Sequence, residues 1–167
     1  SIGTTNDGDE IDIESLISDA GGGYSLDIYG NGNGLGIIRY DGNGTGLYSG
    51  TTYTGYTGTT TLHDGQLYLN VTTLPAILGP LVVGDNVGTP ATAYVQEQQN
   101  GQVADGSSVT VKSDGRFDLN GFTDTIGNLT VNGGDVFTQD AGHLTTGTIT
   151  LTNGAVMPGP GVTSGMG

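Results

Sequence analysis

The stretch from Val109 to Met157 contains three copies of one short pattern: Val109-Thr110-Val111, Leu129-Thr130-Val131 and Ile149-Thr150-Leu151. Each copy reads apolar, threonine, apolar, and successive side chains of a strand face opposite sides. The β-branched threonine suits the outer face of a sheet, so each copy predicts one strand. A turn follows each copy, at Ser113-Asp114-Gly115, Gly133-Gly134 and Asn153-Gly154, and then an apolar residue, at Phe117, Val136 and Val156.

This succession of strand, turn and strand recurs every twenty residues, because the copies start at Val109, Leu129 and Ile149. A fixed period of about 20 to 50 residues is typical of repeat proteins. One coil cannot bury its apolar side chains alone, so neighbouring coils must stack and pair their backbones. The pattern therefore predicts an all-β fold, a single-stranded parallel β-helix (β-solenoid) with about 20 residues per coil.

We expect the chain to contain three segments. Residues 1–29 are predicted to be an N-terminal cap or subunit-contact segment, residues 30–157 the β-solenoid, and residues 158–167 a flexible tail rich in Gly and Pro. Within residues 9–20 the apolar residues have helical spacing, whereas Ile11 and Ile13 also alternate as in a strand. A short capping helix and a strand are both consistent with this pattern. Either would cover the open edge of the first coil.

Further strands are predicted where Gly-rich turns separate apolar runs, at residues 24–29, 35–40, 45–48, 61–67, 81–85 and 91–99. Leu62 and Val111 hold equivalent places in the pattern but are 49 positions apart, which is not a multiple of twenty. An insertion must therefore lie between them. We place it at residues 72–90, a stretch with three prolines.

The composition excludes several classes of partner. The chain has 17 acidic residues, three Lys and Arg residues and a formal net charge of −14, so nucleic acids and anionic membranes would be repelled. It has no cysteine, so no disulfide framework is expected. A membrane helix needs about 20 apolar residues, and the longest apolar run, residues 74–83, is interrupted by Pro75 and Pro80. We predict neither nucleic-acid binding nor membrane insertion.

One segment resembles the passenger-associated (autotransporter-associated) β-strand repeat: Gly46-Leu47-Tyr48-Ser49-Gly50-Thr51-Thr52-Tyr53-Thr54-Gly55, followed by Thr57, Thr61-Leu62, Asp64-Gly65 and Leu67. Tyr56 stands where the second glycine of that repeat is usual. With the later Gly and apolar positions, the resemblance extends over residues 35–157. It implies an extracellular bacterial protein, secreted or displayed on the cell surface, built as a parallel β-helix. These repeats carry no catalytic residue that could be transferred to this chain.

Residues that could carry catalysis are few. The two histidines, His63 and His143, lie on different coils, and His63 is expected to be an exposed turn residue. A polysaccharide-active enzyme would need paired carboxylates, and the only cluster in the sequence is Asp114, Asp118, Asp124 and Asp135, with Arg116 nearby. Aspartates in turns commonly bond their own backbone, however. We therefore expect no catalytic site and no enzyme.

The acidic N-terminal stretch is the one candidate metal site. Asn6-Asp7-Gly8-Asp9-Glu10-Ile11-Asp12 offers oxygen ligands but lacks the order of an EF-hand loop. Asp7, Asp9 and Asp12 are the candidate ligands for Ca²⁺, and a solvated acidic face is the alternative interpretation. No other cofactor is expected.

The predicted function is structural. The last coil of a solenoid leaves backbone groups unpaired, and a head-to-tail contact between copies that does not close gives a filament. The predicted contact residues are Ile11, Ile13, Leu16, Ile17, Ile149, Leu151 and Val156. The alternative is an adhesin or glycan-binding surface fragment, in which tyrosines stack on sugars or, equally, on one another. The tyrosines in question are Tyr24, Tyr29, Tyr40, Tyr48, Tyr53 and Tyr56.

Overall fold

All regular elements that the structure describes are β-strands. The structure is a computed structural model, and it describes residues 1–14, 17, 22–30, 34–41, 56–72, 74–139 and 141–158. These residues form fourteen strands and contain no helix. The predicted all-β class is confirmed for this part of the chain. Residues 45–48, predicted as a strand, and residues 159–167 of the predicted tail lie outside it.

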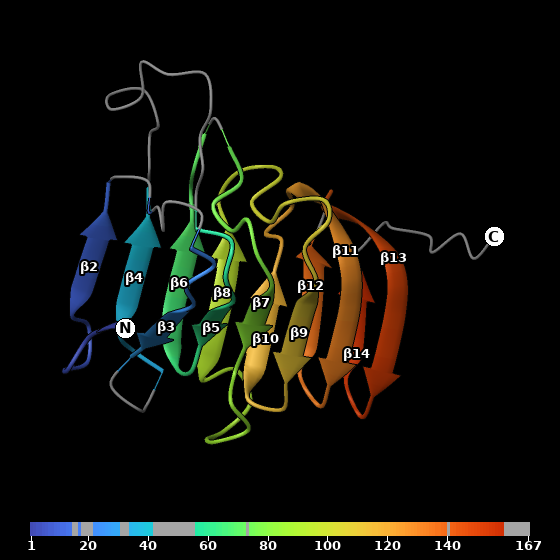
Figure 1. Cartoon of the computed structure of the whole chain (residues 1–167). Coiled ribbons are helices and arrows are strands. Elements are labelled where there is room, and N and C mark those ends of the chain that lie inside the picture. The colour runs from blue at the N-terminus through green and yellow to red at the C-terminus, as the bar shows by residue number, and fades with distance from the viewer. Residues whose placement is uncertain are drawn as a thin grey trace, which may run out of the picture.

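The strands form two seven-stranded sheets (Figure 1). Sheet A contains, in spatial order, β1 (Ile2–Gly3), β3 (Leu26–Tyr29), β5 (Thr60–Leu62), β7 (Leu81–Val83), β9 (Val109–Lys112), β11 (Thr123–Asn132) and β13 (His143–Thr152). Sheet B contains β2 (Glu10–Ile13), β4 (Ile37–Tyr40), β6 (Gly65–Leu69), β8 (Ala93–Glu97), β10 (Gly115–Asp118), β12 (Asp135–Gln139) and β14 (Ala155–Pro158).

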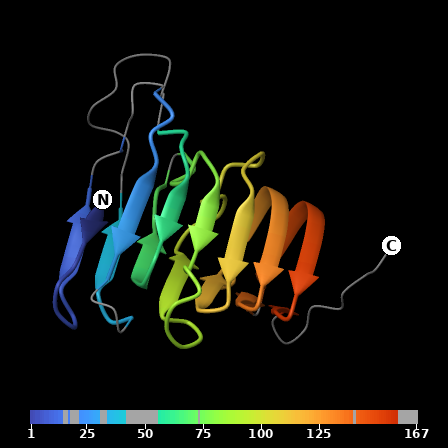
Figure 2. The ribbon, with the colours of Figure 1, turned by 60° about the horizontal axis from the view of Figure 1, so that its bottom comes forward.

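Every pair of neighbouring strands in either sheet is parallel, and the chain changes sheet after each strand. Spatial order therefore follows sequence order, and the strands succeed one another from one end of the molecule to the other (Figure 2). Parallel strands require a crossover between them, and here the opposite sheet supplies it. Each strand from β3 to β12 accordingly pairs with the second strand before it and the second strand after it.

The register explains the repeat that is visible in the sequence. Leu129 pairs with Val109 on one side and with Ile149 on the other, so the twenty-residue spacing is the offset between β9, β11 and β13. The offset is longer toward the N-terminus, because Leu81 pairs with Val109 and Leu26 pairs with Thr60. The extra residues lie in the connections between strands. A uniform offset of twenty is therefore wrong for the strands before β9.

The predicted insertion is only partly in the right place. Leu62 pairs with Val83, an offset of 21, so residues 72–80 fit a regular step. The step from Val83 to Val111 is 28 positions, and its extra residues lie in the connections at 84–92 and 98–108. The side-chain amide of Gln102 fixes the second connection, because it donates to the Val71 carbonyl at 2.9 Å and accepts the Val71 N–H at 2.9 Å.

The core lies between the two sheets and consists of rows of apolar side chains in register. In sheet A, Leu81, Val109 and Leu129 are paired neighbours and all have 0% exposure. In sheet B, Val95 and Phe117 are paired and equally buried. Complete burial of such a side chain stabilises the fold by about 1.5–3 kcal/mol. Rows of this kind arise because the side chains of parallel in-register strands lie directly above one another.

The corners between the sheets are close-packed and fixed by side chains. A Cβ at Gly115 would collide with the Val83 carbonyl oxygen, so this corner needs glycine. Asp114 is 1% exposed, and its carboxylate accepts the N–H groups of Asp85 at 3.1 Å and Asn86 at 2.8 Å. These bonds join the corner before β10 to the corner after β7.

The N-terminal segment belongs to the same two sheets. Residues 10–13 form strand β2, which pairs with β4, so the strand alternative for this stretch is confirmed. Ile11 and Ile13 are partly buried against the core. Of the stretch with helical spacing, residues 15, 16 and 18–20 lie outside the described part of the chain.

Candidate functional site

The outer face of sheet B carries a row of polar and aromatic side chains. Along each strand alternate residues point outward, and in register these are Gln66 of β6, Tyr94 of β8 and Arg116 of β10. A second outward row runs beside it through Tyr68, Gln96 and Asp118. Neighbouring strands are about 4.8 Å apart, so each row contains one side chain per strand at intervals of about that distance.

Hydrogen bonds connect the two rows. The Tyr94 hydroxyl donates to Asp118 Oδ2 at 2.8 Å and accepts a bond from Gln96 Nε2 at 2.6 Å. Gln139 Nε2 also donates to Asp118 Oδ2, at 2.6 Å. Burial raises the pKa of Tyr94, and the hydrogen bond to the Asp118 carboxylate raises it further. The Tyr94 hydroxyl is therefore a donor fixed in direction, and its ring is held in one orientation.

Rings and cations stack along the same face. The Tyr68 and Tyr94 rings meet edge to face, with centroids 6.4 Å apart. The Arg39 guanidinium lies 5.0 Å from the centre of the Tyr68 ring, and the Arg116 guanidinium lies 4.6 Å from the centre of the Phe137 ring. Such contacts contribute about 0.5–1 kcal/mol each at exposed sites. Arg39 is also paired with Glu10, and Arg116 is also paired with Asp135.

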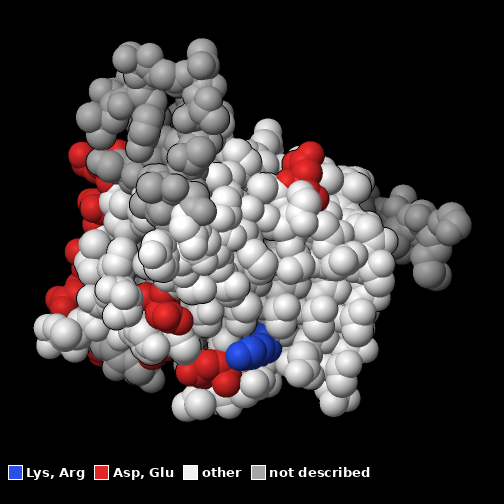
Figure 3. All heavy atoms as spheres, in the orientation of Figure 1, with Lys and Arg blue, Asp and Glu red and all other residues white. Residues whose placement is uncertain are grey.

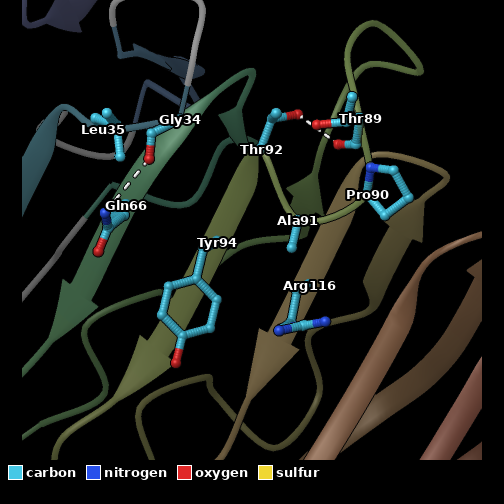
Figure 4. A pocket seen from close by; sticks show the side chains of 9 residues that line it. All are labelled: Gly34, Leu35, Gln66, Thr89, Pro90, Ala91, Thr92, Tyr94 and Arg116. Carbon is cyan, nitrogen blue, oxygen red and sulfur yellow. Dashed lines mark hydrogen bonds between the residues drawn. The ribbon is translucent and has the colours of Figure 1, made fainter. Parts of the chain in front are cut away.

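A hollow of about 370 Å³ opens over the first outward row. In Figure 4 the Tyr94 ring and the Arg116 guanidinium lie side by side on adjacent strands, with Gln66 on the far side of Tyr94 and the 89–92 connection above them. The lining residues are Gly34, Leu35, Gln66, Thr89, Pro90, Ala91, Thr92, Tyr94 and Arg116. Ala91 has a φ of 64°, a left-handed conformation that is rarely adopted by alanine.

The structure does not assemble the four predicted acids into one site. Asp114 lies before β10 and caps a corner, whereas Asp124 lies in β11, after the far end of β10. Asp124 is 1% exposed and accepts the N–H groups of Val103 and Thr125. Asp135 contacts Arg116 at 3.8 Å, and Asp118 serves the network around Tyr94. The four acids that were considered as a catalytic cluster therefore have separate structural roles.

The sequence interpretation missed a buried acid, Glu97. Glu97 is 0% exposed, and its carboxyl group, when protonated, can donate a hydrogen bond to the neighbouring Asp124 carboxylate. Burial raises the pKa of Glu97 to about 11, and the neighbouring Asp124 and Asp118 carboxylates add to the shift. Glu97 is therefore protonated at neutral pH. The signal in the sequence is its alternation with Ala93 and Val95, which places all three on the inner face of β8.

The candidate calcium ligands Asp7, Asp9 and Asp12 do not form a cluster. Among the described residues, no group of three or more His, Cys, Asp or Glu side chains is placed to hold a metal ion. The Asp9 carboxylate accepts bonds from the side chain and the backbone N–H of Asn6, and these bonds lower the pKa of Asp9. Asp12 lies on β2 beside Glu10, and desolvation followed by repulsion from Glu10 raises the pKa of Asp12.

His63 is not the solvent-facing turn residue that the sequence suggested. Its Nε2 lies 3.1 Å from Asp27 Oδ1, its Nδ1 lies 3.3 Å from Asp85 Oδ2, and its side chain is 22% exposed. The ring also stacks on Tyr29, with a centroid distance of 4.2 Å. The two carboxylates contact different nitrogens of the ring, so His63 connects Asp27 of β3 with Asp85, which follows β7. The three side chains do not face one common site.

The predicted sugar-stacking tyrosines separate into different environments. Tyr40 is 2% exposed and Tyr56 is 3% exposed, so both belong to the core and the prediction is wrong for them. Tyr24 and Tyr29 are exposed. Tyr48 and Tyr53 lie outside the described residues. The tyrosines on the hollowed face, Tyr68 and Tyr94, were not singled out from the sequence.

The predicted subunit-contact residues lie at the two ends of the sheets. Ile149 and Leu151 of β13 are 49% and 51% exposed, and Val156 of β14 is partly buried. Ile11, Ile13 and Ile17 are partly buried against the core. Leu16 is not among the described residues. No helix in the part of the chain that the structure describes is long and apolar enough to cross a membrane.

Comparisons with known proteins add no assignment. A scan against protein-family models, a search of curated proteins and a search of solved structures each returned no match.

Proposed function

We propose that this chain is an extracellular structural protein, a β-solenoid whose coils stack head to tail on other copies in a filament or matrix fibre. In this proposal each pair of successive strands, one from each sheet, is one coil. Support comes from the parallel pairing throughout both sheets and from the change of sheet after every strand. Seven coils at about 4.8 Å per step would give a body about 30 Å long.

The observation that carries the proposal is the uncovered apolar face of β13. Val109 and Leu129 are 0% exposed, whereas Ile149, the next residue in the same row, is 49% exposed. The row through Val111, Val131 and Leu151 changes in the same way, from 0% to 51% exposure. Ile149 and Leu151 thus hold core positions that no described residue covers as their counterparts in β9 and β11 are covered. One further coil would bury them.

The uncharged edge strand β13 favours pairing with another chain, and a copy of this chain is the covering layer that we propose. Natural proteins protect open sheet edges with charged residues, short strands or proline. The ten-residue edge strand β13 carries no Asp, Glu, Lys or Arg. On the face seen in Figure 3, acidic side chains gather toward β2, and the surface over β13 shows none. The β2 end also exposes its own pairing edge and offers Ile11 and Ile13.

The test is the state of association of the 167-residue protein. We expect sedimentation velocity to show mass increasing with concentration, and negative-stain images to show particles that lengthen in one direction only. Head-to-tail contacts do not close on themselves, so a ladder of sizes is expected rather than a single dimer. A single monomeric species at all concentrations would refute the proposed assembly.

A further inference from the structure

We propose that the hollow on the outer face of sheet B is a binding site for a neutral oligosaccharide, with Tyr94, Gln66 and Arg116 as its principal contacts. The hollow lies on an outward face, whereas the proposed assembly uses the edge strand β13. The two inferences are therefore independent, and each can fail alone.

The Tyr94 ring supplies the stacking surface. Its hydroxyl is held between Asp118 and Gln96, and the Tyr94 and Tyr68 rings meet edge to face. Tyr94 is one of the residues that line the hollow, and Figure 4 shows its ring between Gln66 and Arg116. A ring fixed in this way loses little conformational freedom when a ligand packs on it. The carbon-bound hydrogens of a pyranose ring form a flat apolar surface that suits an aromatic face.

The polar groups on either side of the ring suit hydroxyl groups. Gln66 and Arg116 flank Tyr94 in register, so amide, phenol and guanidinium follow one another at steps of about 4.8 Å. The Gln66 amide donates only a long bond, 3.3 Å, to the Gly34 carbonyl. Arg116 contacts Asp135 at 3.8 Å, so its guanidinium retains donor capacity. A hydroxyl group both donates and accepts, which fits this mixed set.

The local charge selects a neutral ligand. Of the nine lining residues Arg116 alone is charged, and Asp135 and Asp118 lie next to it on the same face. An anionic ligand would meet these two carboxylates in a chain of net charge −14. A cationic ligand would meet Arg116. A neutral, hydroxyl-rich ligand avoids both costs.

The connection above the hollow has a fixed shape. Thr92 donates two bonds to the Thr89 carbonyl, from its N–H at 3.2 Å and from its hydroxyl at 2.9 Å. Ala91, within this turn, adopts a left-handed conformation that disfavours residues with a side chain. Strained residues persist where the surrounding structure imposes their conformation, and they are concentrated at binding and catalytic sites. The rim of the hollow is therefore preformed in the absence of a ligand.

The experiment is isothermal titration calorimetry of the 167-residue protein with four neutral probes, namely cellohexaose, maltohexaose, laminarihexaose and xylohexaose. Hexagalacturonic acid is the anionic comparison. We expect at least one neutral probe to bind with a Kd below about 1 mM. The anionic probe should bind more weakly. Absence of binding by all four neutral probes, or binding of the anionic probe alone, would overturn the proposal.

Variants locate the site. Tyr94→Ala should weaken binding at least about tenfold, because it removes a central aromatic contact. Tyr94→Phe keeps the ring and should retain most of the affinity. Tyr24→Ala, at an exposed tyrosine outside the hollow, is the matched control and should change nothing. Because Tyr94 is partly buried, Gln66→Ala provides a second loss of affinity, and the thermal unfolding of both variants checks that the fold is retained. Unaltered affinity in both Tyr94→Ala and Gln66→Ala would place the binding elsewhere.

Discussion

Glu97 is an acid at a position where the fold requires an apolar side chain. It follows Ala93 and Val95 on the inner face of β8, and its carboxyl group is fully buried. Because burial raises its pKa from 4.5 to about 11, the folded protein retains a proton that the unfolded chain releases. The stabilising effect of proton binding is complete below pH 4.5 and declines as the pH rises toward 11.

We predict that Glu97→Gln reduces the dependence of stability on alkaline pH. The amide keeps the shape of the protonated acid and cannot ionise, so the slope due to Glu97, at most about 1.4 kcal/mol per pH unit, disappears. Urea unfolding at pH 5, 7 and 9 measures this slope. Glu14→Gln, at an exposed acid outside the strands, is the control and should leave the slope unchanged. Equal slopes for wild type and Glu97→Gln would contradict the assignment.

Single residues were the least predictable level of this protein. The alternation within β8 assigns Glu97 to the inner face, but the pattern alone does not show that Asp124 and Asp118 lie near its carboxyl group. The assignment of His63 to solvent was wrong because Asp27 of β3 and Asp85, which follows β7, contact its ring. Tyr40 and Tyr56 were mistaken for surface residues because aromatic side chains suit both core and surface.

At the level of elements, β13 carries the assembly proposal. We predict that Ile149→Lys abolishes concentration-dependent association. A lysine at this inward position would bring a charge into the layer that a neighbouring copy must cover. The fold itself should survive, because Ile149 is already half exposed. Sedimentation velocity of wild type and variant at matched concentrations checks the prediction.

The control for this variant lies one residue further on. Thr150 pairs with Thr130 on the opposite face of sheet A, so Thr150→Lys adds the same charge to the same strand but points it outward. We expect Thr150→Lys to associate as the wild type does. Equal loss of association in both variants would show that strand charge, rather than burial of Ile149, controls the contact.

The repeat in the sequence predicts some elements well and others poorly. Strands β9, β11 and β13 follow from the three copies because their connections keep a constant length. The hollow on sheet B does not follow from it. Gln66 and Tyr94 are 28 positions apart, and only knowledge of the connections at 70–80 and 84–92 places them in register. The connections differ in length, so the sequence alone does not show that Gln66 and Tyr94 lie in one row.

At the level of the whole molecule, each strand depends on its immediate neighbours. Inner strands such as β7 to β10 have a paired strand on both sides, whereas β1, β2, β13 and β14 have one only on one side. In such stacked arrays stability is approximately a sum of local and nearest-neighbour terms. The two ends should therefore open more readily than the middle.

Hydrogen exchange measured by mass spectrometry tests this gradient. We predict the slowest exchange in β7 to β10 and faster exchange in β1, β2, β13 and β14 at low protein concentration. Raising the concentration should protect β13 selectively if copies stack on it. Uniform protection along the chain would contradict the nearest-neighbour description.

The class of the fold was open to prediction from the sequence, but its dimensions were not. Alternating short apolar runs separated by glycine turns exclude long helices and indicate an all-β fold, as the structure confirms for the described residues. The number of residues between paired positions ranges from the 19 that separate Arg116 from Asp135 to the 34 that separate Leu26 from Thr60. Connection length leaves no periodic signal, since turn residues carry no fixed pattern of burial.

The unequal offsets have a practical consequence. Where Leu81 meets Val109 the connecting corners hold more residues than where Val109 meets Leu129, yet the two ladders join without a break. Extra residues in a connection therefore leave the pairing of the strands unchanged. A foreign epitope inserted into such a corner would be exposed to solvent. The choice of corner would set the position of the epitope along the stack of strands.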